Sequence, residues 1–157
     1  MSRANLHRPA NHVRVEPHTG ALLRLAWQRI REQIYSGVKG DGYDDLNPAH
    51  VAMFRFESLD GKRPTQLSEQ MQITKQSVHD LVRHLEKCGY AELQPDPADS
   101  RARLLRLTPR GRKLDFSVQK HAYIAEKELE KQLGTERFCE FVSTLKLIVG
   151  SPEKLTP

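Results

Sequence analysis

The stretch that decides the fold runs from Pro64 to Lys113 and reads PTQLSEQMQITKQSVHDLVRHLEKCGYAELQPDPADSRARLLRLTPRGRK. Up to about Cys88, apolar residues recur at intervals of three and four, which predicts helices. Two short runs, AELQ and ARLLRLT, then follow and are typical of strands. The segment PDPADS between them favours a turn. The predicted order is a short helix, a tight turn, a longer helix, two strands around a basic loop, and the start of another helix.

This order is that of a winged helix-turn-helix, a module that places its second helix in a groove of DNA. The charges agree with that use, because nine Lys and Arg oppose five Asp and Glu between Thr74 and Lys113. The whole chain carries a net charge of +5, which favours a polyanionic partner. A modest excess of charge also serves solubility, so the charge alone does not decide the partner.

The helix predicted from Thr74 to about Cys88 has one apolar face, which we expect to meet the core. Its start and its opposite face carry side chains of the kinds that bind phosphates and base edges. A polar face is common to surface helices, and the preceding helix and following basic hairpin are what favour DNA reading. Asp80 fits a DNA-binding face least well, because a carboxylate repels phosphate. Two roles remain open for it: accepting a hydrogen bond from cytosine, or pairing with Arg83 or His84. The expected DNA contacts are Thr74, Lys75, Gln76, Ser77, His79 and Arg83.

The basic loop after this helix is a candidate for a second DNA contact. An arginine at a hairpin tip can enter a narrow minor groove, where the electrostatic potential is most negative. Asp99 precedes Arg101 by two residues and is placed to brace it. The alternative is an ordinary charged turn. The expected contacts in this loop are Asp99, Arg101 and Arg103.

Two motifs, ITKQSVHDLVRHLEKCGY and DPADSRARLLRLTPRGRKL, resemble the recognition helix and the wing of the MarR family of winged-helix transcription regulators. The resemblance runs from about Asp45 through Lys113. It implies a homodimer on a palindromic operator in double-stranded DNA, with recognition helices in major grooves and wing arginines in flanking minor grooves. Two positions depart from the family pattern, since Gln72 replaces the usual glycine of the turn and Ser100 replaces a second wing arginine.

Outside the predicted DNA-binding lobe of residues 45–113, the chain divides into further parts. Residues 1–18 contain arginines and prolines without periodicity and predict a flexible basic arm. Residues 19–36 and 114–150 carry apolar stripes that the small lobe is too short to cover, so we expect a helical dimerisation region. The predicted fold class is mainly α with a small β-hairpin wing and long N- and C-terminal dimerisation helices.

Local signals also predict where the helices begin and end. Capping side chains, two of them followed by proline, predict starts at Thr19, at Asn47-Pro48 and at Thr108-Pro109. Glycine-containing segments predict ends at Gly37, at Asp60-Gly61 and at Gly134.

The resemblance further implies a small aromatic acid as effector, bound between the dimer helices and the DNA-binding lobe. Aromatic side chains are candidates for such a pocket, although aromatics at helical spacing are more commonly part of a core. The candidates are Trp27, Tyr35, Phe54, Phe56 and Phe116.

An enzyme is not expected, since the sequence has no nucleophile elbow, phosphate loop or His-Glu metal motif. Ser77, His79 and Asp80 lie on one helix and cannot form a catalytic triad. No cofactor and no metal site are predicted. The chain has neither a ~20-residue apolar run nor a secretory signal, which favours a cytoplasmic protein.

Two other binding functions remain open. A thiol-based redox sensor would use Cys88 or Cys139, but we expect both thiols to be buried and inert. A winged helix that serves only protein assembly is the other alternative, and the polar helix face and wing arginines argue against it.

Overall fold

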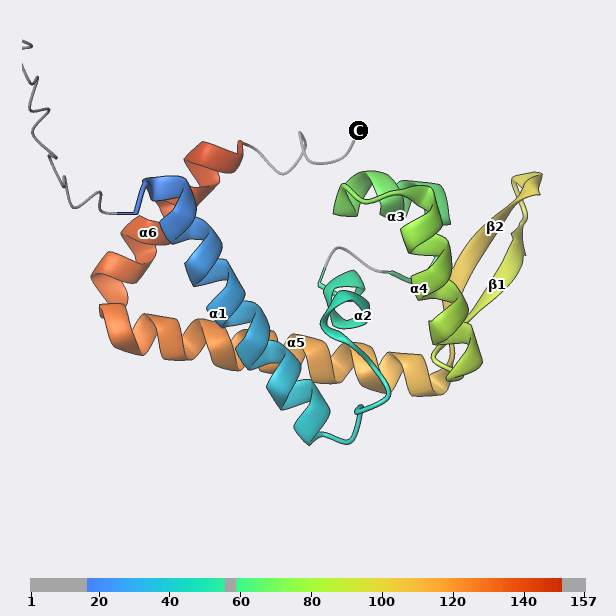
Figure 1. Ribbon diagram of the computed structural model, residues 1–157, viewed down its shortest axis with the longest axis horizontal. Helices are drawn as coiled ribbons and strands as arrows, with labels where there is room; N and C mark the ends of the chain where they lie inside the picture. The colour runs from blue at the N-terminus through green and yellow to red at the C-terminus, as the bar shows by residue number, and fades with distance from the viewer. Residues whose placement is uncertain (1–16, 56–58, 151–157) are drawn as a thin grey trace, which may run out of the picture.

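The computed structural model describes residues 17–55 and 59–150, so most of the predicted N-terminal arm and Phe56 lie outside the described residues (Figure 1). The described part is mainly helical with one two-stranded antiparallel sheet, which confirms the predicted mainly α class with a small β-hairpin. No helix in these two ranges is long and apolar enough to span a membrane. The elements are α1 (Thr19–Gly40), α2 (Pro48–Met53), α3 (Pro64–Met71), α4 (Lys75–Lys87), β1 (Ala91–Asp96), β2 (Asp99–Leu107), α5 (Pro109–Leu133) and α6 (Thr135–Val149).

Helix α5 runs along the length of the molecule and joins its two ends (Figure 1). Helix α1 crosses it and packs against it, α6 lies at one end, and α2 to α4 and the hairpin lie at the other. The core forms around α2, α4 and the first half of α5, whereas α6 has no buried residue. The largest fully buried side chains of this core include Met53, Phe54, Leu67, Leu85, Tyr90 and Leu114.

Side-chain caps fix the starts of three helices, two of them at the predicted cap-then-proline pairs. The Asn47 carboxamide oxygen accepts hydrogen bonds from the backbone N–H groups of residues 49 and 50. The Thr74 and Thr108 hydroxyls each accept from the backbone N–H three residues later, at 3.1 Å. These bonds satisfy amide groups that a helix cannot pair internally.

Helix α1 corrects two predictions. It starts after His18, with no side-chain cap from Thr19, and it continues through Gly37 to Gly40. A Cβ at Gly37 would lie 2.2 Å from Nδ1 of His121 on α5. Gly37 therefore permits the close approach of two helices instead of ending one.

Helix α2 also ends earlier than predicted, at Met53 and not at Asp60-Gly61. Residues 60–62 instead bind strand β2. The Asp60 carboxylate accepts from the backbone N–H of Leu107 at 3.0 Å, and Gly61 N–H donates to the Leu105 carbonyl at 2.7 Å. The Leu105 N–H in turn donates to the Lys62 carbonyl at 2.9 Å.

The hairpin is longer and its turn tighter than the sequence suggests. Strands β1 and β2 pair in one register from Ala91 opposite Leu107 to Pro95 opposite Arg103, and after a register shift Asp96 lies opposite Asp99. The turn is therefore two residues, not the whole PDPADS segment, and Arg101 and Arg103 lie on β2 instead of in a loop. Cross-strand hydrogen bonding extends the strands through residues whose local preference is for turns.

Candidate nucleic-acid interface

The turn between α3 and α4 sets the angle of the second helix. Gln72 ends α3 in the left-handed conformation, with φ of 52°. Among the described residues, no other non-glycine residue has a positive φ. The side chain at this position makes the conformation costly, as expected from the missing glycine. The Ile73 N–H donates to the Ser68 carbonyl at 3.2 Å and closes the turn.

Helix α4 turns the predicted polar residues to solvent. Val78, Val82 and Leu85 are buried, and Leu81 is half-buried against the core. The Thr74 and Ser77 hydroxyls lie 2.8 Å apart at the helix start. The six predicted DNA contacts on this helix are all exposed: Thr74, Lys75, Gln76, Ser77, His79 and Arg83.

Asp80 organises the two neighbouring polar side chains on this exposed face. The Gln76 amide donates to both Asp80 oxygens at 3.2 and 3.3 Å, and the Arg83 guanidinium lies 3.5 Å from the same carboxylate. His84 is not its partner, because its Nε2 lies 2.7 Å from the Asp45 carbonyl. Pairing with Arg83 is thus the alternative that the structure contains.

The wing arginines Arg101 and Arg103 are exposed on β2. Asp99 braces the backbone of Arg101 and not its guanidinium, since it accepts the Arg101 backbone N–H at 3.1 Å. The Arg103 guanidinium donates to the Leu93 carbonyl on β1 at 3.3 Å. The strand and the turn therefore define where both side chains leave the backbone.

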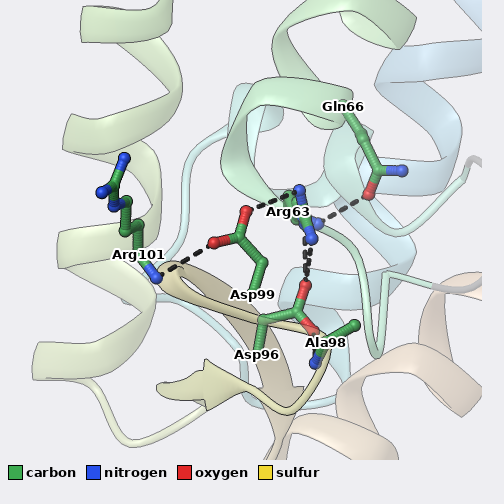
Figure 2. Close-up of polar contacts among 6 residues, drawn as sticks. All are labelled: Arg63, Gln66, Asp96, Ala98, Asp99 and Arg101. Atoms are coloured by element: carbon green, nitrogen blue, oxygen red, sulfur yellow. Dashed lines mark hydrogen bonds and ion pairs between the residues drawn. The ribbon is translucent and has the colours of Figure 1, made fainter.

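Arg63, just before α3, is a wing contact that the sequence analysis missed (Figure 2). Its Nε and Nη2 donate to one Asp96 oxygen at 2.8 and 2.5 Å, and its Nη1 lies 3.5 Å from Asp99. The backbone N–H of Ala98 and the Arg63 guanidinium hold the pKa of Asp96 below its usual value. The partners are separated by 33 residues along the chain, so no local pattern indicates this pair.

A second cluster missed by the sequence analysis joins the base of the lobe to α5. The buried Tyr90 hydroxyl donates to Asp45 at 2.6 Å, and the Arg110 guanidinium donates to both the Asp45 carboxylate and the Tyr90 oxygen, at 3.1 and 2.9 Å. Burial raises the pKa of Tyr90 to about 12, so this residue stays a hydrogen-bond donor. The cluster fixes α5 relative to the end of α4.

The four described aromatic candidates for a ligand pocket do not meet. Trp27 lines a cavity of about 370 Å³ between α1, α5 and α6. Tyr35 donates its hydroxyl to the Leu46 carbonyl at 3.0 Å, and Phe54 is buried in the core. Phe116 is 73% exposed and lines a different cleft.

Arg55 was not predicted to line this cavity. Its guanidinium carbon lies 4.2 Å from the centre of the Trp27 ring, and its Nε and Nη1 atoms are buried without a hydrogen-bond partner among the described residues. Burial, with a smaller contribution from nearby Arg31, lowers the pKa of Arg55 to about 10. The cavity thus combines an aromatic wall with a cation whose hydrogen bonds are unsatisfied.

The two cysteines differ in exposure. Cys88 is half-buried, and burial, followed by Asp45, raises the pKa of its thiol. Cys139 is exposed on α6, so the expectation of two buried thiols is wrong for this residue. Apolar neighbours of Cys139 on α6 line the cavity between α1, α5 and α6, whereas Cys139 itself does not.

Residues 45–102 match the model of the MarR family, and this range covers the helix-turn-helix and the wing up to Ala102. The helix-turn-helix and wing of this chain are therefore similar to those of the MarR family. Solved structures of transcription regulators share the fold. A transcriptional regulator from Thermotoga maritima, Tm0710, is 28% identical over 85% of this chain and 92% of its own, with a TM-score of 0.55.

Two further MarR-fold structures superpose more closely at lower identity. The reduced form of MarR from E. coli is 19% identical, covers 87% of this chain and 98% of that chain, and gives a TM-score of 0.73. The transcriptional repressor CouR, bound to a 23-mer DNA duplex, is 23% identical over 84% of this chain and 92% of its own, with a TM-score of 0.68. No curated protein matches the sequence.

Proposed function

We propose that this protein is a sequence-specific DNA-binding transcription regulator of the MarR family that acts as a homodimer on a palindromic operator. The observation that carries the proposal is the outward polar face of α4, with exposed wing arginines on β2 beside it. Amide and guanidinium groups on that face match base edges, and hydroxyl and ammonium groups at its start match phosphates. The structurally similar CouR is bound to DNA, which supports the same use of this fold.

A homodimer is part of the proposal because apolar side chains remain exposed on the terminal helices. We call these residues the terminal-helix patch; they lie on α1 and α6, outside the core of the DNA-binding lobe. An exposed apolar surface of this kind favours a protein partner, and a two-fold copy is the common solution. The patch comprises Leu22, Leu25, Trp27, Leu147, Ile148 and Val149.

The experiment that tests the function selects operator sites from a random DNA library and compares base preferences. Gln76→Ala should relax the preference at one position in each half-site, because the amide is a base-edge donor and acceptor on the exposed face. Lys75→Ala should weaken binding to all DNA sequences about equally. It should also lower the slope of log affinity against log salt concentration by about one for each phosphate that is no longer neutralised. Gln132→Ala and Lys131→Ala, exposed on α5, are matched controls that should change neither. A Gln76→Ala preference matrix identical to that of the native protein would contradict the assigned reading face.

We also infer that the cavity beside Trp27 binds a small aromatic acid that modulates DNA binding. A planar ring can pack on the apolar walls, while the carboxylate satisfies the unpartnered Nε and Nη1 of Arg55. A guanidinium pairs well with a carboxylate because two parallel hydrogen bonds form. This argument needs Arg55 and Trp27, but not Tyr35, Phe54 or Phe116.

Trp27 is the single tryptophan of the chain, so its fluorescence reports directly on this cavity. Benzoate should change the Trp27 emission, and benzamide, which lacks the charge, should bind more weakly. Arg55→Met should weaken benzoate binding about 10- to 100-fold, as expected for the removal of a charged hydrogen bond. Arg31→Met, which removes a nearby charge outside the cavity lining, is the control. Equal affinity of the native protein and Arg55→Met for benzoate would refute the carboxylate site.

A further inference from the structure

We propose that Arg63 is the positioning residue of the wing, so that the helix-turn-helix itself sets where Arg101 meets DNA. The proposal rests on the DNA-binding function proposed above. Arg63 joins the start of α3 to both aspartates that flank the two-residue turn of the hairpin (Figure 2). Three nitrogens of one guanidinium take part, which only arginine among the basic residues can supply in a fixed planar geometry.

The two aspartates need such a cation. Asp96 and Asp99 face each other across the hairpin, where like charges destabilise strand pairing. Each uses its second oxygen to bind the turn backbone, Asp96 accepting from the Ala98 N–H at 2.9 Å and Asp99 from the Arg101 N–H at 3.1 Å. Asp96 is also 8% exposed, so solvent screens its charge poorly. Arg63 therefore stabilises the two carboxylates that shape the turn.

The segment before α3 holds the strand that carries Arg101 both near its base and near its tip. Near its base, Leu105 exchanges backbone hydrogen bonds with Gly61 and Lys62. Near its tip, Asp99 lies against Arg63. Both points attach to one short segment, residues 61–63, which runs directly into α3.

The backbone of Arg63 is itself fixed at the start of α3. Its N–H donates to the side-chain oxygen of Gln66 at 2.8 Å. The direction of β2 is therefore coupled to the helix pair that carries the reading face. Without the Arg63 side chain, the base of the hairpin would remain attached while its tip would no longer be tied to α3.

Arg63 also neutralises negative charge close to the proposed DNA surface. In Arg63→Ala, two carboxylates would lie near the phosphates without their cation, so this variant combines lost charge with lost positioning. Arg63→Lys keeps the charge but removes the planar fork, so it separates the two effects. If positioning dominates, Arg63→Lys should behave more like Arg63→Ala than like the native protein.

The first test needs no DNA. Hydrogen exchange should be about 5- to 10-fold faster at the Ala98 and Arg101 amides in Arg63→Ala, because the carboxylates that accept from them lose their anchor. Exchange at the Leu105 amide should change little, since its partner is the Lys62 carbonyl. Unchanged exchange at Ala98 and Arg101 would overturn the proposal. Arg24→Ala, an exposed arginine on α1, is the matched control.

The second test is a double-mutant cycle on the selected operator. Arg101→Ala should lower operator affinity about 10-fold or more, and the charge-conserving Arg63→Lys about 5- to 10-fold. If Arg63 acts through Arg101, then Arg63→Lys should cost less than about 2-fold in the Arg101→Ala background. Losses that multiply would mean that Arg63 acts independently of Arg101 and would overturn the positioning role. A native protein that binds no DNA would end the proposed function, while the exchange data would still decide whether Arg63 holds the wing.

Discussion

Gly111→Ala should destabilise the protein by about 2–4 kcal/mol, because no space exists for even one methyl group at this position. Gly111 is buried in the first turn of α5. A Cβ there would lie 1.9 Å from the Tyr90 carbonyl oxygen and 2.9 Å from the carbonyl carbon. These are backbone atoms, so they cannot rotate away as a side chain can. The same carbonyl oxygen accepts the Thr108 N–H at 3.1 Å, which ties the start of α5 to the end of α4.

Thermal unfolding should show the effect as a fall in Tm of roughly 2–4 °C per kcal/mol for a chain of this size. Two other glycines provide graded controls. In Gly37→Ala the added Cβ would lie 2.2 Å from the His121 imidazole, a side chain that can shift, so the loss of stability should be about 1 kcal/mol. Gly40→Ala meets nothing within 4 Å and should stay within about 0.5 kcal/mol of the native protein. A Gly111→Ala protein as stable as the Gly40→Ala variant would rule out the tight contact between α5 and Tyr90.

The features that the sequence predicted well are those determined by residues close together in the chain. A helix cap joins a side chain to an amide two or three residues away, so Asn47 and Thr108 could be identified directly. The exposed face of α4 follows from the helical repeat in the same way, because Val78, Val82 and Leu85 must share one side.

The features that it missed depend on residues far apart in the chain. A glycine such as Gly37 is typical of a helix end, yet α1 continues through it. The close approach of His121 is what requires glycine at this position. The PDPADS segment has turn preferences throughout, yet strand pairing restricts the turn to two residues. Arg63 looks like an ordinary basic residue until the hairpin brings Asp96 and Asp99 against it.

The ligand candidates failed to converge for a related reason. Aromatic side chains mark apolar surface but not which element covers it, so the core residue Phe54 and the exposed Phe116 were indistinguishable in the sequence. Arg55 could not be identified as a cavity residue, because its unpaired nitrogens follow only from the packing of α1, α5 and α6.

Ile148→Glu should convert the proposed dimer into monomers at micromolar concentration. Ile148 is 66% exposed and follows Phe141 and Leu145 at helical spacing on the apolar side of α6. In a two-fold dimer the substitution would place two unpaired carboxylates in the interface, and burying an unpaired charge is strongly destabilising. The fold of each subunit should remain intact, since no residue of α6 is buried. Sedimentation equilibrium measures the change in mass.

Loss of the dimer should lower affinity for the palindromic operator roughly 100-fold or more, because two linked half-sites bind far more tightly than one alone. Ser143→Glu is the matched control, since it adds the same charge to α6 at an exposed position on the side away from Ile148. The control should remain dimeric and retain operator binding, which would show that the position and not the added charge matters. An Ile148→Glu protein that sediments as a dimer would exclude this side of α6 from the interface. A native protein that sediments as a monomer would rule out the homodimer itself, and the exposed apolar residues of α1 and α6 would then require a different partner.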